Sequence, residues 1–448
     1  MSDEMLDILR PFLEMASRLG ADEVELFAQR SNEKTVNFQT SALNSAAGSI
    51  LEGVGIRVLI KKSLGFISVN SLDPAKIETS LHDAISIAKV TPPEDFHSLP
   101  SPSEISDIPG LYDPKVDQIS MEEVLEKSKQ LLEDATSFDE RISVDSGTFY
   151  AGSTEYAVIN SKGLEASDKR TSLQSFIFGM AIDGDDIGSF DYEFESVTQL
   201  KDADMGSIAQ SFGKKVLRNL GAVKMESFAG SAIMTPDALS DLLGVLIESA
   251  KANQIQTGSS YLADRLGQEI AVNSFSIIDD GTQEAAAGSG AFDREGVPHQ
   301  KHPIVQNGVF KGILYDTFTS NKDGLESTGH ASGTFRGMPN ISQTNIDVLP
   351  GDSSLDEMIR EVKHGILIPR ISAFPDTVSG NFTGPIKGGQ LIKNGQIECT
   401  LKETMITGNL FEALMNITSI SKERKPIRYQ STTFMLPYIQ MDGMKYAA

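Results

Sequence analysis

The stretch from Asn273 to Gly337 decides the fold, and it reads NSFSIIDDGTQEAAAGSGAFDREGVPHQKHPIVQNGVFKGILYDTFTSNKDGLESTGHASGTFRG. Short apolar runs alternate in it with acidic and glycine-rich turns, which is typical of antiparallel strands. Asn307-Gly308 lies between two apolar runs, and Asn-Gly suits a two-residue type I′ hairpin turn because both positions need a positive φ. The same pattern returns at Asn394-Gly395. We therefore expect residues 223–448 to form a mainly antiparallel, barrel-like β domain with helices on it.

A helix enters this second domain through Thr235-Pro236, which reads as an N-cap followed by a proline at the first helical position. Leucines and isoleucines at helical spacing continue that pattern to about Lys251. Further helices are predicted over residues 354–365 and about 408–417.

Residues 1–222 read as a separate α+β domain in which long helices pack on an antiparallel sheet. Helical spacing of apolar residues predicts helices over 3–19, 74–90, 120–137 and 205–220. Period-2 patterns predict strands over 24–27, 35–39, 53–60, 65–69, 141–150, 155–160 and 172–182. Ser120 and Glu123 form a candidate capping box. The segment 91–114 carries six prolines, so we expect a linker or a long covering loop between sub-units of about 1–90 and 115–222.

Composition restricts the possible functions. The 448 residues are 40% hydrophobic and 23% charged, with a net charge of −23 and one cysteine. Such an acidic surface repels phosphate backbones and anionic lipid, so we expect no nucleic acid or membrane partner. No apolar run approaches the ~20 residues that span a bilayer. The acidic, amphipathic first twenty residues do not resemble an export signal, and with the lone cysteine they favour the cytoplasm.

The histidines argue against a zinc-hydrolase helix, because none of the six is followed by glutamate. His299-x-x-His302 is the one close pair. With Glu295 or Asp293 it could hold a metal, although prolines on both sides place it in a loop. Phosphate-binding glycine motifs and a serine nucleophile elbow are absent. Cys399 alternates with apolar residues and reads as a buried, inert thiol.

Five polar residues remain as candidates for a substrate cleft. Asp279 and Asp280 sit in an Asp-Asp-Gly turn, and Asp293 and Glu295 in an Asp-Arg-Glu-Gly turn. Each turn is most simply structural, but either could carry carboxylates into a cleft. His330 lies in a loop of small residues that could face the same cleft.

Nearly the whole chain resembles the TldD/PmbA family, also called TldD/TldE. The N-terminal matches are Ala21-Asp-Glu-Val-Glu-Leu-Phe27, Gly53-Val-Gly-Ile-Arg57 and Gly65-Phe-Ile-Ser68. The C-terminal matches are denser: Ile277-Ile-Asp-Asp-Gly281, Phe292-Asp-x-Glu-Gly-Val-Pro298, Val305-x-Asn-Gly308, Glu326-Ser-Thr-Gly-His330, Met338-Pro339, Thr344-Asn345, Leu349-Pro-Gly351, Val378-Ser-Gly-Asn-Phe382 and Gly388. Their order along the chain is the specific feature.

The resemblance implies a cytoplasmic zinc metallopeptidase assembled from two paralogues. The family's catalytic subunit carries His-Glu-x-x-x-His on the helix before the Asp-Asp-Gly turn, together with a late cysteine ligand. Counting back from Asp279, the motif falls near residues 243–248, where Leu243, Gly244 and Glu248 replace its three functional residues. The Glu-Ser-Thr-Gly-His segment is typical of the PmbA/TldE branch. The resemblance therefore implies a subunit with no catalytic residues and no zinc of its own.

That reading makes this chain a partner of a TldD-like paralogue that holds the zinc, or one half of a homodimer, with peptide as substrate. Two alternatives stay open. One is an autonomous metal-dependent hydrolase built on His299, His302 and Glu295. The other is a non-enzymatic protein that binds or regulates other complexes.

Overall fold

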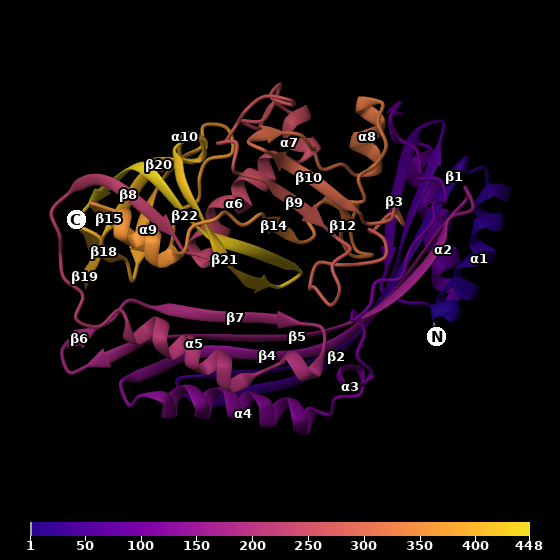
Figure 1. Ribbon diagram of the computed structural model, residues 1–448. Helices are drawn as coiled ribbons and strands as arrows, with labels where there is room; N and C mark the ends of the chain where they lie inside the picture. The colour runs from indigo at the N-terminus through magenta and orange to yellow at the C-terminus, as the bar shows by residue number, and fades with distance from the viewer. Residues whose placement is uncertain (1) are drawn as a thin grey trace.

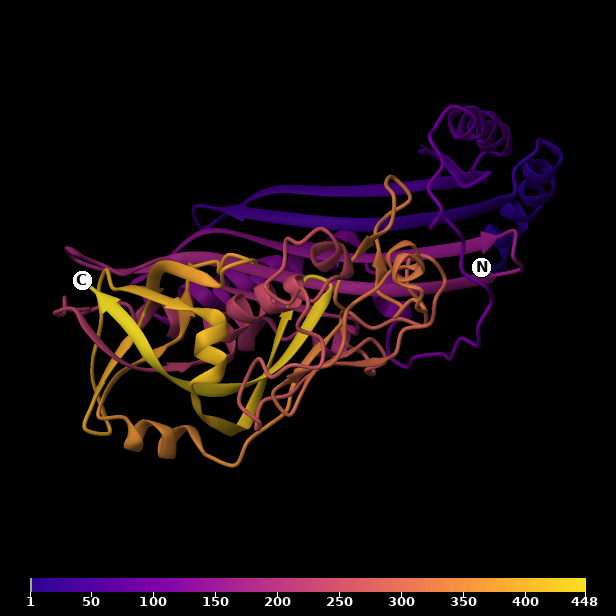
Figure 2. The same cartoon turned by 90° about the horizontal axis from the view of Figure 1, so that it is seen from above.

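The computed structural model describes residues 2–448, which form two large sheets and a small two-stranded one, β12-β13 (Figure 1). The first is a long, curved sheet made by the N-terminal half of the chain. The second, made by the C-terminal half, lies along it, and the two termini lie at opposite ends of the molecule (Figure 2). The mixed α+β class and the packing of helices on antiparallel sheet are confirmed. Among residues 2–448, no helix has both the length and the apolar character to cross a bilayer.

The N-terminal half forms a seven-stranded sheet in the order β3-β2-β1-β4-β5-β6, with β7 also paired to β5. Its elements are α1 (Ser2–Arg18), β1 (Glu23–Gln39), β2 (Ala42–Ile60), β3 (Ser63–Val69), α2 (Pro74–Ala88), α3 (Pro114–Asp117), α4 (Met121–Phe138), β4 (Ile142–Asn160), β5 (Glu165–Asp183), β6 (Asp186–Ile187), β7 (Asp191–Val197), η1 (Leu200–Asp202) and α5 (Met205–Leu217). Because β1 pairs with β2 on one side and β4 on the other, residues 1–90 and 115–222 share one sheet.

Several predicted strands are longer than expected. The separate strands predicted over 24–27 and 35–39 are wrong, because β1 runs unbroken through both. The strands predicted over 141–150 and 155–160 likewise join as β4. One face of these strands packs on helices and the other stays half-open, so polar residues continue the strand where the sequence suggests a turn. Helix α1 is continuous through Pro11.

Helices cover the long sheet in two places. Helices α1 and α2 pack over one end, and α4 and α5 over the other. The predicted capping box is confirmed, because the Ser120 side chain accepts from the Glu123 N–H while Glu123 reaches back to the Ser120 N–H. Gly65 allows β3 to approach α2 closely, since a Cβ there would lie 1.9 Å from the Ala84 carbonyl oxygen. The proline-rich segment is a covering loop, tied down where the Asn160 amide donates to the Pro100 carbonyl at 2.9 Å.

The C-terminal half forms a thirteen-stranded sheet whose main path is β11-β10-β9-β14-β22-β8-β15-β18-β19. Its elements are β8 (Phe228–Met234), α6 (Pro236–Ser249), α7 (Ala252–Gln256), β9 (Ile277–Asp280), β10 (Lys301–Gln306), β11 (Val309–Phe310), α8 (Thr317–Asp323), β12 (Ala331–Ser332), β13 (Asn340–Ile341), β14 (Ile346–Val348), α9 (Leu355–Glu361), β15 (His364–Ile368), β16 (Arg370–Ile371), β17 (Asn381–Lys387), β18 (Gln390–Lys393), β19 (Gln396–Thr400), β20 (Met405–Asn409), α10 (Leu410–Met415), β21 (Ile417–Tyr429) and β22 (Thr432–Ala447). Strand β22 is its hub and pairs with β14, β8, β20 and β21.

The sheet is mainly antiparallel, as predicted, with two parallel pairs, β14–β22 and β8–β15. Both Asn-Gly hairpins are confirmed. Asn307 has φ 50° and Gly308 φ 78°, and Asn394 and Gly395 have φ 50° and 79°. Helix α6 starts at the predicted Thr235 cap and buries its leucine stripe in the core of this half. The helix predicted over 354–365 is too long, because α9 ends at Glu361 and the chain then enters β15.

A buried ion network joins the two halves. The Arg57 guanidinium on β2 donates to Glu25 on β1 at 3.1 Å and to Glu295 of the second half at 2.7 Å. Arg294 donates to Glu25 at 3.0 Å, and the other Glu295 oxygen accepts the Thr317 N–H at 2.8 Å. Side chains of both glutamates are at most 1% exposed. Breaking such a pair strands an uncompensated charge in the interior.

We expect Arg57→Ala to lower the free energy of unfolding by about 3–5 kcal/mol, because Glu295 would stay buried without its cation. The control is Arg30→Ala, which removes an ion pair with Glu52 that is 38% exposed on each side and should cost no more than about 1 kcal/mol. Urea unfolding followed by circular dichroism measures both variants. Equally small changes in the two would show that the buried network adds no stability.

Candidate functional site

Both halves of the chain line a cleft between the two sheets. Strand β7 and helix α5 form one wall, and α6, β16 and β21 form the other. Two cavities of about 490 and 590 Å³ occupy it, and they share Glu193, Glu195, Lys215, Asp237 and Arg428. We call the first the charged cavity and the second the aromatic cavity.

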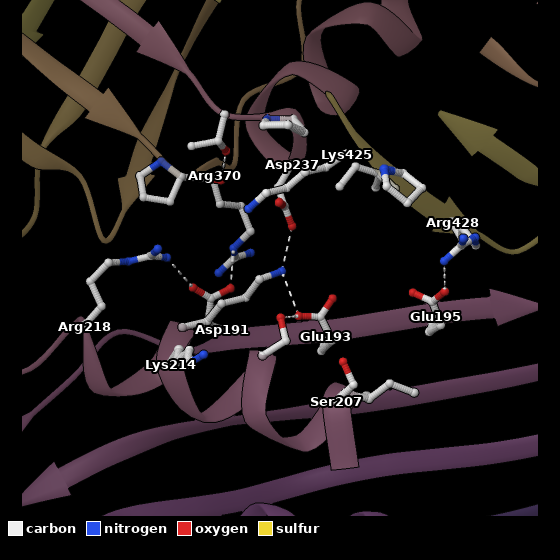
Figure 3. A pocket seen from close by; sticks show the side chains of 18 of the residues that line it. Asp191, Glu193, Glu195, Ser207, Lys214, Arg218, Asp237, Arg370, Lys425 and Arg428 are labelled. Carbon is white, nitrogen blue, oxygen red and sulfur yellow. Dashed lines mark hydrogen bonds and ion pairs between the residues drawn. The ribbon is translucent and has the colours of Figure 1, made fainter. Parts of the chain in front are cut away.

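Ion pairs fill the charged cavity (Figure 3). Lys215 of α5 lies between Asp237 of α6 at 2.6 Å and Glu193 of β7 at 3.1 Å. Burial alone would lower the pKa of Lys215, but these two carboxylates raise it, so the ammonium is held charged. Burial raises the pKa of Glu193, against the opposing pull of Lys215. This ion pair therefore spans the cleft from one half of the chain to the other.

A second set of pairs centres on Asp191, whose side chain is 1% exposed. Figure 3 shows Asp191 between Arg370 of β16, at 3.0 Å, and Arg218, at 3.8 Å. Farther along β7, Glu195 pairs with Arg428 of β21. Six acidic and six basic side chains line this cavity. Since most of them are already paired with each other, the charged cavity mainly holds β7 against the second half.

The aromatic cavity adjoins the charged cavity along β7. Tyr192, Phe194, Phe374 and Tyr429 line it, and the rings of Phe194 and Tyr429 lie 4.8 Å apart. Phe374 is 80% exposed, which is unusual for so large an apolar side chain. Asp241 of α6 lies among these rings, and burial raises its pKa to about 7.

Helix α6 presents a defined face to the aromatic cavity. Ser240, Asp241, Gly244 and Val245 line it, and a Cβ placed on Gly244 would meet open space. Leu243, in contrast, is fully buried in the core of the second half. Glu248 lies near the end of the helix, where it pairs with Lys251 at 2.5 Å and accepts a hydrogen bond from Gln254 at 2.9 Å.

Two of the predicted cleft residues meet, but outside this cleft. Asp279 is fully buried on β9, accepts the Thr344 N–H at 3.0 Å and lies 3.5 Å from His330 Nε2. Asp280 closes its own turn, accepting the Thr282 N–H at 3.0 Å. The other ring nitrogen of His330, Nδ1, lies 2.8 Å from Thr328 Oγ1.

Three histidine side chains lie near Asp279: those of His299, His302 and His330. The rings of His302 and His330 lie 5.6 Å apart, and His299 and His330 line a cavity of about 230 Å³. Burial lowers the pKa of His299 to about 3 and of His302 to about 4, with a contribution from His330 in both cases. His299 Nδ1 and His302 Nε2 are buried and make no hydrogen bond to any part of the chain that the structure describes. The rings of His299 and His302 are therefore held neutral.

Asp293 and Glu295 both make hydrogen bonds within the chain, and Asp293 also lines the cavity of His299 and His330. Asp293 accepts the backbone N–H groups of Glu295 at 2.8 Å, Val297 at 3.0 Å and Ala331 at 2.9 Å, which fixes its own turn. Glu295 uses both oxygens in the interdomain network and faces Arg57. Within residues 2–448, no three His, Cys, Asp or Glu side chains are arranged to hold a metal ion.

Most of the residues that line the cleft were not predicted from the sequence. Its clearest overlooked signal is Asp191-Tyr-Glu-Phe-Glu195, where acidic and aromatic residues alternate with the period of a strand. That alternation places Asp191, Glu193 and Glu195 on one face of β7 and Tyr192 and Phe194 on the other. The matching cations lie on α5, β16 and β21, up to 233 positions away in the chain, so no local pattern indicates them.

Comparison with known proteins covers nearly the whole chain. Residues 24–88 match a family model described as PmbA/TldA metallopeptidase domain 1, residues 114–220 match the central domain, and residues 229–448 match the C-terminal domain. The chain is 28% identical to an uncharacterized protein of Methanocaldococcus jannaschii, over 87% of this chain and 89% of that one. It is 24% identical to the metalloprotease PmbA homolog of Haemophilus influenzae, over 92% and 90%.

The fold also matches solved structures. The crystal structure of TldE from Thermococcus kodakarensis superposes with a TM-score of 0.90 at 23% identity, covering 98% of this chain and 100% of that one. At this identity the similarity establishes the fold.

The neutral histidines predict a pH-dependent stability. Their folded pKa values lie below the ~6.5 of an unfolded histidine, so the unfolded chain binds more protons as the pH falls below about 6.5. Stability is therefore lost between pH 7 and 5, by about 1–2 kcal/mol for each buried histidine. We expect His302→Gln to flatten the dependence of unfolding free energy on pH, measured by urea unfolding at pH 7, 6 and 5.

The matched control is His82→Gln, since His82 lies exposed on α2. It should leave the slope as in the unaltered protein. An unchanged slope in His302→Gln would mean that His302 is protonated in the folded state.

Proposed function

The chain belongs to the PmbA/TldD family of metallopeptidases, and from this we propose that it is a PmbA/TldE-type subunit that binds peptide for a zinc-bearing partner. In this proposal the partner is a TldD-like paralogue, and it supplies the zinc and the general base. This chain completes the assembly and offers the cleft between its two sheets to an extended peptide. A homodimer is the other assembly that the experiment below tests.

The cleft-facing surface of α6 carries this proposal. Catalytic zinc takes three protein ligands from His, Cys, Asp or Glu, and a His-Glu-x-x-x-His motif places its residues on one helix face within about 140°. The face that lines the aromatic cavity carries Asp237, Ser240, Asp241, Gly244 and Val245. Its two carboxylates, of which Asp237 is already paired with Lys215, do not supply the three ligands of a zinc site. We therefore assign no metal to this chain.

The geometry also refines where the family's motif would fall. Placing its first residue at Leu243 would direct a ligand into the core, because Leu243 is fully buried there. The spacing i, i+1, i+5 instead fits Ser240, Asp241 and Val245, all of which line one cavity. Replacement at Leu243, Gly244 and Glu248 stays a prediction, and the three cavity-lining positions are the better fit.

Two strand edges suit an extended peptide. Among the residues that the structure describes, strand β7 pairs only with β5, and β21 pairs with β22 and otherwise forms one bridge, between Ser421 and Ser353. The two strands come together across the cleft, where Ser196 Oγ donates to the Gln430 carbonyl at 2.8 Å. A peptide that adds to a free strand edge gains backbone hydrogen bonds whatever its sequence. Such binding suits unfolded or short peptides. The cytoplasm is the expected location for a chain with a single cysteine.

An autonomous hydrolase at His299, His302 and Glu295 lacks support from the geometry. Both Glu295 oxygens are occupied by Arg57 and the Thr317 N–H. A non-enzymatic binding protein would use the same cleft, and it differs from our proposal in one outcome, the absence of stimulated cleavage.

We predict that zinc enters only with the partner. Elemental analysis of this chain purified alone should give less than about 0.1 zinc per chain. The complex with a His-Glu-x-x-x-His paralogue should give about one zinc per pair, because one catalytic site needs one ion. Cleavage of an unfolded protein substrate should require both chains. A paralogue whose motif glutamate is changed to glutamine is the control, retaining zinc while losing cleavage.

Three outcomes separate the readings. About one zinc in each lone chain would overturn the proposal and favour the autonomous hydrolase. A complex that forms without cleaving any unfolded substrate would favour the binding protein. If the paralogue alone binds zinc and cleaves the substrate, and adding this chain does not raise the cleavage rate, the proposed role of this chain is wrong.

A further inference from the structure

The aromatic cavity has an excess of negative charge. Four carboxylates line it, those of Glu193, Glu195, Asp237 and Asp241, against two cations, Lys215 and Arg428. The three other carboxylates are already paired. Lys215 lies between Glu193 and Asp237, and Arg428 pairs with Glu195.

Asp241 is the carboxylate left over. In the part of the chain that the structure describes, its carboxylate has no hydrogen bond and no ion pair. The nearest cationic influence comes from Arg370, whose guanidinium is already 3.0 Å from Asp191. Burial is the main cause of the raised pKa of Tyr192, and among the charged groups Asp241 contributes most to it. An unpaired, largely buried acid therefore faces an aromatic ring across a cavity open to a ligand.

We propose that the aromatic cavity is a subsite for a protonated amine of the bound peptide, with Asp241 as its counter-ion. This inference rests on the proposed peptide-binding function and specifies which peptides the cleft prefers. The amine is a lysine side chain or the peptide's own N-terminus, which share the same ammonium chemistry. An ammonium supplies the charge that Asp241 lacks and forms a charge-assisted hydrogen bond with it.

The walls of the cavity suit the same group. Tyr429 lines the cavity with a ring that attracts a cation to its face and can contact the methylene stem of a lysine. The Arg370 guanidinium already lies over the Tyr192 ring, 5.0 Å from its centroid. Phe194 and Phe374 extend this apolar lining towards the mouth. A metal ion is a poorer occupant, because hard cations need several oxygen ligands and only one carboxylate here is free.

The preference depends on pH. Asp241 must be ionised to hold an ammonium, so its raised pKa weakens the preference as the pH falls from 8 to 6. The charged groups facing it come from every neighbouring element. They are Asp237 on α6, Arg370 on β16, Glu193 and Glu195 on β7, Lys215 on α5 and Arg428 on β21. All of these groups except Arg370 line the cavity, where they are held in ion pairs with one another. The affinity for the amine between pH 8 and pH 6 therefore follows the ionisation of Asp241.

Three matched peptides test the proposal. The first is acetyl-Gly-Leu-Lys-Leu-Gly-amide. The second replaces lysine with norleucine, which keeps the methylene stem without the charge, and the third is the norleucine peptide with a free N-terminus. Affinities are measured by isothermal titration calorimetry at pH 8 and pH 6, with this chain alone and with its complex.

We expect the lysine peptide, the free-amine peptide or both to bind about tenfold more tightly than the neutral peptide at pH 8. The preference should shrink at pH 6 and disappear in Asp241→Asn. Asp83→Asn is the control, because it removes an exposed carboxylate on α2 that lines neither cavity. Its preference should match that of the unaltered protein, and thermal melting establishes that both variants are folded.

Each other outcome counts against the proposal. Equal binding of charged and neutral peptides, or a preference that survives Asp241→Asn, overturns the amine subsite and leaves peptide binding intact. Binding of none of the three peptides, alone or in the complex, removes the proposed peptide-binding function and this inference together. Which of the two charged peptides gains affinity identifies the source of the amine.

Discussion

The buried contact of Arg57 with Glu25 and Glu295 sets the geometry of the whole molecule. It ties two adjacent strands of the first sheet to a turn of the second, 238 positions later in the chain. A charge removed from water is tolerated only when its partners stay in place, so this network permits one arrangement of the halves and disfavours others. The cleft exists only in that arrangement, because β7 and α5 supply one wall and α6, β16 and β21 the other. This ion network lies outside both cavities, and it joins the two halves of the chain that form their walls.

Inside the cleft, charge is distributed unevenly. On one face of β7, acids and bases neutralise each other across the two halves, so that cavity acts as a second fastening. In the adjoining aromatic cavity, aromatic rings and several of the same ion pairs surround one acid with no partner, Asp241. Alternation along β7 places its carboxylates on one face and its rings on the other, and the unpaired acid comes from α6. One strand therefore both holds the halves together and forms part of a binding surface.

Local signals in the sequence predict much of the fold. The capping box at Ser120, the proline-marked start of α6 and both Asn-Gly hairpins depend on neighbouring residues, and each is confirmed. Strand lengths were wrong where a half-open sheet face admits polar residues, as in β1 and β4. The site was harder to predict. Asp279 and His330 do meet, but Glu295 is drawn away by Arg57, and the cleft gathers residues from Asp191 to Phe434. Contacts between residues so far apart in the chain produce no periodic pattern in the sequence.

The position of β22 has a consequence for synthesis. This last strand is the hub of the second sheet and pairs with β8, β14, β20 and β21. A chain emerging from the ribosome can complete its first sheet early, since residues 23–197 contain every strand of it. The second sheet has to wait for the final residues, leaving β8 and β14 without their central neighbour until translation ends. Domains generally fold as units in the order of synthesis, and here the cleft becomes complete only when the whole chain has been released.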